Sequence, residues 1–240
     1  MNIEIFDIVL IAVMVLVIPA VALRDARQNS TGAKAPGTSV RPFVTTVVVE
    51  VVQVAAVATW WFIAQRDFGA IGLNFETGGD SWRLGTMLAL GTCACLIAQT
   101  LIIARNPTRA EAMRKEYASS SAGEMIPTDG RQVRWWTAVS VTAAIGEEFR
   151  YRGFLIVILS TLVNPWIAMV ISSMIFGLGH IYMGVGGFIK TAVNGVIMGT
   201  IFLLTGSLWA PILVHFTLDL SWGLLMRRIM ATAPLTEPAG

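Results

Sequence analysis

Charged residues are scarce in this chain, and their scarcity narrows the class of protein. They make up 13% of the 240 positions, while hydrophobic residues make up 55%. A soluble domain has about 25% charged residues, so the composition favours a polytopic membrane protein. The net charge of +2 is small, and no basic cluster with interleaved aromatic residues is present. We therefore expect no nucleic-acid partner.

Cysteine is also rare, and its spacing excludes two common uses. Cys93 and Cys95 are the only cysteines, and one residue separates them within an apolar stretch. They are too close for an ordinary disulfide and lack the second pair that a structural zinc site requires. We expect them to pack as small apolar side chains against a neighbouring helix.

Long apolar segments dominate what is present, and each is a candidate for the roughly 20 residues of a membrane span. They are residues 5–23, 42–64, 84–104, 135–161, 166–182, 187–205 and 208–226. The fourth is too long for one simple span, and we expect it to break near Glu147 and Glu148. The predicted fold is all-α, a polytopic transmembrane helix bundle of about seven to eight spans around an intramembrane polar cavity.

The basic residues predict the orientation of this bundle. With seven spans and the N-terminus outside, 13 of the 17 Lys and Arg residues fall on one side and two on the other. Arg150 and Arg152 remain inside a span. Because cytosolic loops are enriched in Lys and Arg, we expect a cytosolic C-terminus. The expected location is the plasma membrane of a bacterium or archaeon, with the lipid bilayer as a partner.

Both histidines of the chain, His180 and His215, lie in apolar segments. Ionisable side chains at membrane depth are costly and usually face the interior of a bundle, where they indicate a functional site. On a helix His215 shares a face with Asp219, four residues later. Phe176 stands one turn before His180 in the same way.

A third polar cluster, Glu147-Glu148-Phe-Arg-Tyr-Arg152, lies in the apolar segment upstream. Glu148 and Arg152 are four apart and can pair on one helix face, whereas Glu147 is rotated by roughly 100° and points elsewhere. Such a pair alone could simply join two helices. Its occurrence together with both histidines favours one shared site. Glu50 stands alone in the second span, and we expect a structural or cavity-lining role.

Taken in order, three motifs resemble the CPBP family, which groups type II CAAX prenyl endopeptidases with bacteriocin-processing and self-immunity proteins. The motifs are Glu147-Glu148-x-x-x-Arg152, Phe176-x-x-x-His180 and His215-x-x-x-Asp219. The resemblance covers roughly residues 130–228 and implies an intramembrane endopeptidase with a cavity open towards the cytosol. We accordingly expect N-terminal spans and a cytosolic loop over 1–130, a catalytic helical core over 131–228 and a cytosolic tail over 229–240.

The resemblance also implies roles for the motif residues. Glu147 would activate a water molecule as general base, and His180 would help to hold that water. His215 and Asp219 would stabilise the oxyanion of the tetrahedral intermediate. This chemistry is reasonable, because peptide hydrolysis without a nucleophilic side chain needs an oriented water, a base and donors at the developing charge.

Glu148 and Arg152 would order this cluster, but the last motif departs from the pattern. It often ends in Asn in prenyl endopeptidases, and here it ends in Asp219. An ionised Asp cannot donate a hydrogen bond. This weakens the oxyanion role and favours a divalent metal such as zinc, for which four motif side chains are plausible ligands. Those four are Glu147, His180, His215 and Asp219. A metal-free mechanism and a metal-dependent mechanism both stay open.

Three functions are compatible with this sequence. The leading one is an integral-membrane endopeptidase that acts on a peptide or protein, prenylated or not, in CAAX-like C-terminal processing or a related reaction. The second is a non-catalytic scaffold or bacteriocin-immunity protein of the same fold. The third is a proton-coupled transporter, which is less favoured because paired halves with matching broken helices are not evident.

Overall fold

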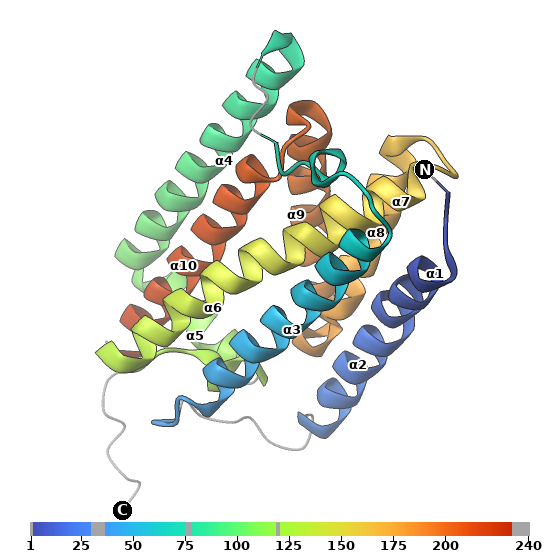
Figure 1. Ribbon diagram of the computed structural model, residues 1–240. Coiled ribbons are helices and arrows are strands. Elements are labelled where there is room, and N and C mark those ends of the chain that lie inside the picture. Colours follow the sequence, from blue (N-terminus) through green and yellow to red (C-terminus); the bar gives the residue numbers. More distant parts are fainter. Residues whose placement is uncertain (1, 30–36, 75–77, 119–120, 232–240) are drawn as a thin grey trace, which may run out of the picture.

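The fold is helical throughout the described part of the chain. The structure, a computed structural model, describes residues 2–29, 37–74, 78–118 and 121–231. The α-helices of these ranges are α1 (Ile5–Ala12), α2 (Ile18–Asn29), α3 (Arg41–Ile63), α4 (Gly79–Arg105), α5 (Pro107–Ala118), α6 (Gly130–Glu148), α7 (Val157–Leu159), α8 (Pro165–Gly179), α9 (Gly184–Thr205) and α10 (Trp209–Ala231). The prediction of an all-α fold is confirmed (Figure 1).

Short segments of other helix types join or interrupt these helices. The two π-helical segments are η1 (Val13–Val17) and η4 (Phe149–Ile156), and the three 3₁₀ segments are η2 (Phe68–Ile71), η3 (Ser121–Met125) and η5 (Ile181–Met183). The segment η1 connects α1 to α2, so the first helical stretch is continuous across it. The segment η4 connects α6 to α7 in the same way.

In the part of the chain that the structure describes, five helical stretches are long and apolar enough to cross a membrane. They are Ile5–Asp25, Arg41–Ile63, Gly79–Arg105, Ile181–Thr205 and Trp209–Ala231. The shorter α8 is also apolar, and the helix from α6 through α7 carries the charged cluster. Together these seven stretches correspond to the seven predicted segments.

The predicted break near Glu147 and Glu148 is wrong. The chain keeps helical dihedral angles at Glu148 (φ −64°, ψ −40°) and at Phe149 (φ −59°, ψ −45°). The helix widens into π turns there instead of ending, as helices often do at functional sites. Neither Pro nor Gly stands at residues 147–152 to interrupt the backbone, so the charged side chains project from one continuous helix.

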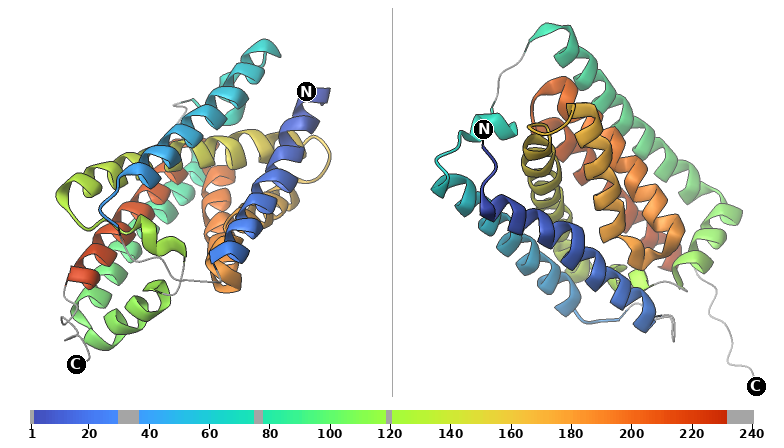
Figure 2. Two further views of the ribbon diagram at one scale, coloured as in Figure 1. Left: turned by 90° about the horizontal axis from the view of Figure 1, so that it is seen from below. Right: turned by 90° about the vertical axis from the view of Figure 1, so that its right-hand side faces the viewer.

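Seen in Figures 1 and 2, α1 and α2 lie on one side of the bundle and α4 lies on the opposite side. The helix formed by α6 and α7 crosses between them, with α3 packed against α6 and α10 packed against both α4 and α6. The main core contains Trp61, Phe154 and Leu155. Large apolar side chains also cover the outside, such as Phe62 at 73% exposure, as expected where lipid is the solvent.

Asp7 fixes the first helix to the end of the second span. Its carboxylate is completely buried and accepts hydrogen bonds from Trp60 Nε1 at 2.8 Å and from Arg66 at 2.7 and 2.6 Å. The remaining donor is the backbone N–H of Glu4, 2.8 Å from Asp7 Oδ2. Since both carboxylate oxygens accept hydrogen bonds, this buried acid joins α1 to the end of α3 and has no unsatisfied oxygen.

Candidate active site

The candidate site forms where the charged helix meets α8 and α10. The helix α6 with its extension η4 contributes Glu147, Glu148 and Arg152, whereas α10 contributes His215 and Asp219. His180 is the C-cap residue of α8. The predicted site residues therefore come from three helices, as expected from the order of the motifs.

Glu148 lies at the centre of the cluster with 0% exposure. Its Oε1 atom accepts a hydrogen bond from Arg152 Nη1 at 2.9 Å, so the predicted pair four residues apart is present. The same oxygen lies 2.8 Å from His215 Nδ1. A carboxylate can only accept, so His215 Nδ1 carries the proton of this bond, and the imidazole is held with Nε2 on its other side.

The free side of His215 faces two further carboxylates. His215 Nε2 lies 3.5 Å from Glu147 Oε2 and 3.6 Å from Asp219 Oδ2. The side chains of Glu147 and Asp219 are 15% and 26% exposed, whereas that of His215 is 5% exposed. The two carboxylates that reach open space are thus separate from Glu148, which is fully enclosed.

Arg152 connects this cluster to two other helices. Besides pairing with Glu148, its Nη2 atom donates to the backbone carbonyl of Gly195 in α9 at 3.2 Å. The centre of its guanidinium stands 4.7 Å from the ring centroid of Phe176 in α8, a favourable cation–π distance. Arg152 is therefore held on three sides, and it fixes the position of Glu148 in turn.

His180 lies beside the other five predicted residues and does not bond to them in the described part of the chain. Its Nδ1 atom is 2.9 Å from the carbonyl oxygen of Phe176. The Phe176 ring centroid lies 4.8 Å from that of His180 and 6.1 Å from that of His215. Phe176 thus contacts both imidazoles, and His180 is linked to the site through this aromatic ring.

Trp136 positions the end of the site on α10. Its Nε1 atom donates to the backbone carbonyl of Asp219 at 3.0 Å. The indole fits closely over Gly223, where a Cβ atom would overlap it. Gly223 therefore allows α6 and α10 to approach, and the hydrogen bond from Trp136 fixes the turn that carries Asp219.

A second buried ion pair adjoins the site and was not predicted. Arg150 Nη2 lies 2.7 Å from Glu50 Oε2 in α3, and Arg150 Nε donates to the Gly146 carbonyl at 3.2 Å. Glu50 therefore has a cationic partner 100 residues away. The sequence held one usable signal, since Arg150 was an intramembrane cation with no assigned acid and Glu50 an intramembrane acid with no assigned cation.

The donor set does not fit a bound metal in this arrangement. Within the ranges described, no group of three or more His, Cys, Asp and Glu side chains is placed to hold a metal ion. One nitrogen of His215 is used by Glu148, and one nitrogen of His180 is used by the Phe176 carbonyl. Each imidazole keeps one nitrogen free, which is the number that a histidine ligand supplies, so the misfit lies in how the donors are grouped and not in the imidazoles.

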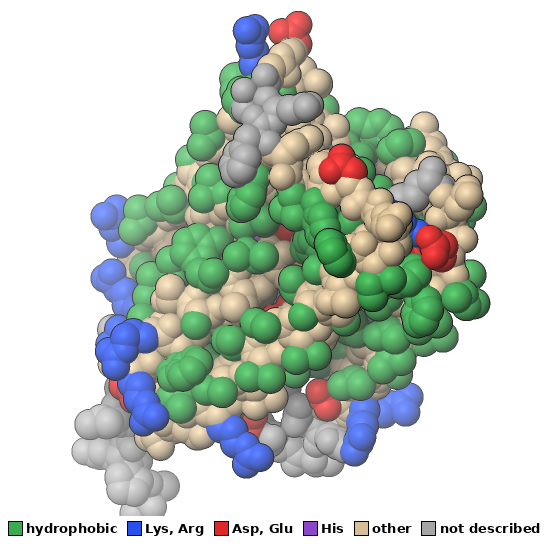
Figure 3. Space-filling view, in the orientation of Figure 1, with side chains coloured by type: hydrophobic (Ala, Val, Ile, Leu, Met, Phe, Trp, Pro, Cys, Tyr) green, Lys and Arg blue, Asp and Glu red, His purple; other side chains and the backbone are tan. Residues whose placement is uncertain are grey.

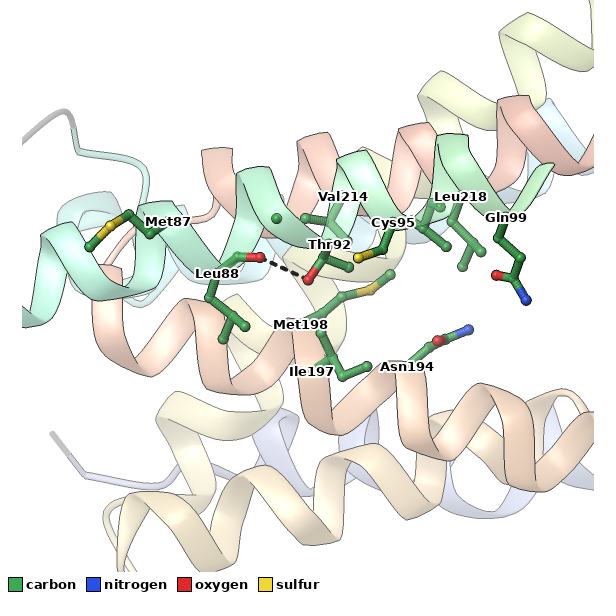
Figure 4. Close-up of a pocket in the computed structure, with 12 residues that line it drawn as sticks. Met87, Leu88, Thr92, Cys95, Gln99, Asn194, Ile197, Met198, Val214 and Leu218 are labelled. Carbon is green, nitrogen blue, oxygen red and sulfur yellow. Dashed lines mark hydrogen bonds between the residues drawn. The ribbon is translucent and has the colours of Figure 1, made fainter. Parts of the chain in front are cut away.

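An apolar groove of about 510 Å³ lies between α4, α9 and α10 (Figure 4). It is lined by Met87, Leu88, Gly91, Thr92, Cys95, Leu96, Gln99, Asn194, Ile197, Met198, Val214 and Leu218. The amides of Gln99 and Asn194 face each other at one end. The sulfur of Met198, which belongs to the groove wall, lies 3.8 Å from Arg152 Nη2. One side chain therefore separates this groove from the buried cluster.

The part of the chain that holds this cluster matches a known protein family. A family model described as type II CAAX prenyl endopeptidase Rce1-like matches residues 129–221. This segment of the chain is Rce1-like. It runs from the N-cap of α6 into α10 and contains all six predicted site residues, so the resemblance carried by the three motifs is confirmed. No curated protein and no solved structure matches the chain.

The apolar helices and the Rce1-like match together indicate an integral membrane protein that resembles a protease family over residues 129–221. The first three spans lie outside the matched residues, and the domain boundaries at 130, 131 and 228 stay predictions. In Figure 3 most of the visible Lys and Arg side chains lie along the lower and lower-left margin of the molecule. Hydrophobic side chains cover much of the rest of the visible face.

Proposed function

We propose that the chain is an intramembrane endopeptidase in which Glu147 activates the water that attacks a peptide bond. The observation that carries this proposal is the different state of the two adjacent glutamates. Glu148 is enclosed and bonded to Arg152 and His215, whereas Glu147 is partly open and has no guanidinium partner among the described residues. A carboxylate without a cationic partner is the better base.

In the proposed reaction Glu147 takes a proton from water while the water oxygen attacks the carbonyl carbon of the substrate. The carbonyl oxygen becomes an oxyanion, and His215 Nε2–H donates a hydrogen bond to it. The bond from the carbonyl carbon to nitrogen then breaks, and Glu147 returns its proton to the leaving amine. Preorganised donors of this kind contribute strongly because they need no reorientation during the reaction.

The remaining site residues support these two groups. Glu148 accepts from His215 Nδ1 and so aims Nε2 towards the reacting atoms. Asp219, 3.6 Å from Nε2, favours the protonated imidazole and hence the stronger donor. His180 helps to hold the water. Every step uses only protein groups and water, in keeping with the donor arrangement described above.

We further propose that the substrate is a peptide that carries a hydrocarbon chain, such as a prenyl group, and that it is processed in a CAAX-like C-terminal reaction. The groove beside Arg152 supports this because its lining is mostly apolar and its volume suits a single hydrocarbon chain. The asymmetry of Lys and Arg supports an N-terminus outside and a site that opens towards the cytosol.

Detergent-purified protein tests the proposal with a panel of prenylated and unmodified peptides. We expect turnover by the parent and loss of at least about 100-fold in Glu147→Gln, since a general base contributes that much or more. The melting temperature should stay near that of the parent. Asp80→Asn, the same acid-to-amide change at an exposed position, is the matched control. A folded parent that cleaves no peptide, or a Glu147→Gln variant that retains a tenth of the rate, contradicts the proposal.

A further inference from the structure

The pair of Glu50 and Arg150 lies in the interior, directly against the turn that carries Glu147. Glu50 is 7% exposed and Arg150 is 3% exposed. A Cβ atom at Gly146, the residue before Glu147, would lie 2.5 Å from Glu50 Oε2. The Glu50 carboxylate therefore occupies the space beside Gly146, and its charge interacts with those of Glu147 and His215.

Arg150 has a second acid within reach on its own helix. Glu147 precedes Arg150 by three residues, across the start of the π turns, and the charges of both act on Glu50. Arg150 makes no bond to Glu147 in the described structure, and its guanidinium is turned instead to Glu50 through Nη2 and to the Gly146 carbonyl through Nε. A buried arginine that loses its partner is costly, and Glu147 would be the acid available to replace Glu50.

We propose that Glu50 is a positioning residue that holds the Arg150 guanidinium on the α3 side of the helix and so keeps Glu147 free to act as a base. This inference rests on the proposed role of Glu147. Each arginine of the cluster then has its own acid: Arg152 is paired with Glu148, and Arg150 is paired with Glu50. Among the described residues Glu147 and Asp219 are left without an arginine, and Glu147 is the one that shares a helix with Arg150.

The charged groups around Glu147 come from several helices. They are Glu148 and Arg150 on its own helix, Glu50 on α3, and His215 and Asp219 on α10. His180, at the end of α8, acts on Asp219. Of these, Arg150 is the cation whose position depends on Glu50, so a change at residue 50 reaches Glu147 through Arg150 as well as through the charge of Glu50 itself.

A double-mutant cycle with Glu50→Gln and Arg150→Gln tests the proposal. In Glu50→Gln the released guanidinium pairs with Glu147, which then loses its proton more readily. We expect the acid limb of the pH profile of kcat to move to lower pH by about one unit, with a lower kcat and little change in KM. Neither Arg150→Gln nor the double variant should show this downward move, because no guanidinium is present to pair with Glu147.

An infrared titration provides a readout that needs no hydrolysis. The C=O band of protonated Glu147, assigned by its loss in Glu147→Gln, should appear at lower pH in Glu50→Gln than in the parent. It should not appear at lower pH in the double variant. If peptides are not cleaved but the band moves as expected, the proposed function fails and the positioning role stands.

Three results would overturn the positioning role. One is an unchanged pH profile and infrared titration in a folded Glu50→Gln variant. Another is an equal downward move in the double variant, which would show that the effect does not pass through Arg150. The third applies if the Glu50→Gln variant does not fold. A move of the acid limb to lower pH in Arg150→Gln would then show that the guanidinium does not cause this move.

Discussion

Asp7 and Glu148 are both completely buried carboxylates paired with arginine, yet their remaining bonds differ. Both oxygens of Asp7 are occupied, by Arg66, Trp60 and a backbone N–H. In Glu148, Oε1 accepts from both Arg152 and His215, while Oε2 has no hydrogen-bond partner among the described residues. Burying an unsatisfied polar atom is costly.

This difference separates a structural connection from a candidate active site. A carboxylate whose acceptor sites are filled by the protein can only join helices, as Asp7 joins α1 to the end of α3. A carboxylate that holds an imidazole and still has an unused oxygen orients a group that faces reacting atoms. A substitution at Asp7 should therefore affect stability alone, whereas a substitution at Glu148 should affect both stability and activity.

The largest combined effect is expected for Glu148→Gln. The change leaves the Arg152 guanidinium without an anion in a buried position and weakens the bond that orients His215. We expect the free energy of unfolding in detergent to fall by about 3 kcal/mol and peptide hydrolysis to fall by about 100-fold. Unfolding titrations and turnover assays check the two effects, and an unchanged stability would contradict the interpretation of Glu148 as the centre of the cluster.

Asp7→Asn should lower stability without changing the chemistry. Arg66 loses its short bonds to the buried carboxylate and keeps only the longer contact of 3.7 Å with Glu4 Oε1 as an ion pair, while Trp60 retains an acceptor in the amide oxygen. We therefore expect a loss of about 2 kcal/mol in the free energy of unfolding. Turnover per folded molecule should match that of the parent. A fall in kcat at full folding would show that the Asp7 end of the bundle and the site are coupled.

Asp219→Asn should have the smallest effect of the three. Asp219 is the most exposed carboxylate of the cluster and has no arginine partner in the described structure, and Trp136 bonds to its backbone and not to its side chain. An amide at this position can donate to an oxyanion, so we expect activity within about tenfold of the parent. Hydrolysis and metal content are measured together for both proteins.

A metal-dependent mechanism predicts the opposite outcome for this variant. Asp219 would then be an anionic ligand, and the amide would bind the ion poorly. Loss of most activity, together with a stoichiometric metal in the parent that disappears in Asp219→Asn, would therefore decide against the metal-free reaction.

The parts of the site that the sequence predicted correctly depend on spacing within a helix. Glu148 bonds to Arg152, and Asp219 lies next to His215, because residues four apart share a face. The helical fold followed from long apolar segments in the same direct way. These features require no knowledge of which helices are neighbours.

The parts that sequence reasoning missed depend on contacts between distant segments. Glu50 meets Arg150 across 100 residues, and Asp7 meets Arg66 across 59. Local spacing contains no information on such pairs. The π turns of η4 were missed for a different reason, since a charged cluster in an overlong apolar segment was interpreted as an interruption of the helix.

The connection at Asp7 also bears on the order in which the chain enters the membrane. Asp7 leaves the ribosome within the first helical stretch, and Arg66 follows as soon as α3 is complete. Before that point, the arginine that pairs with Asp7 in the folded chain has not been synthesised. The first two spans can then close into a hairpin that neutralises its own buried acid. This hairpin can form before the helices that carry the candidate site, which begin at residue 130, have been synthesised.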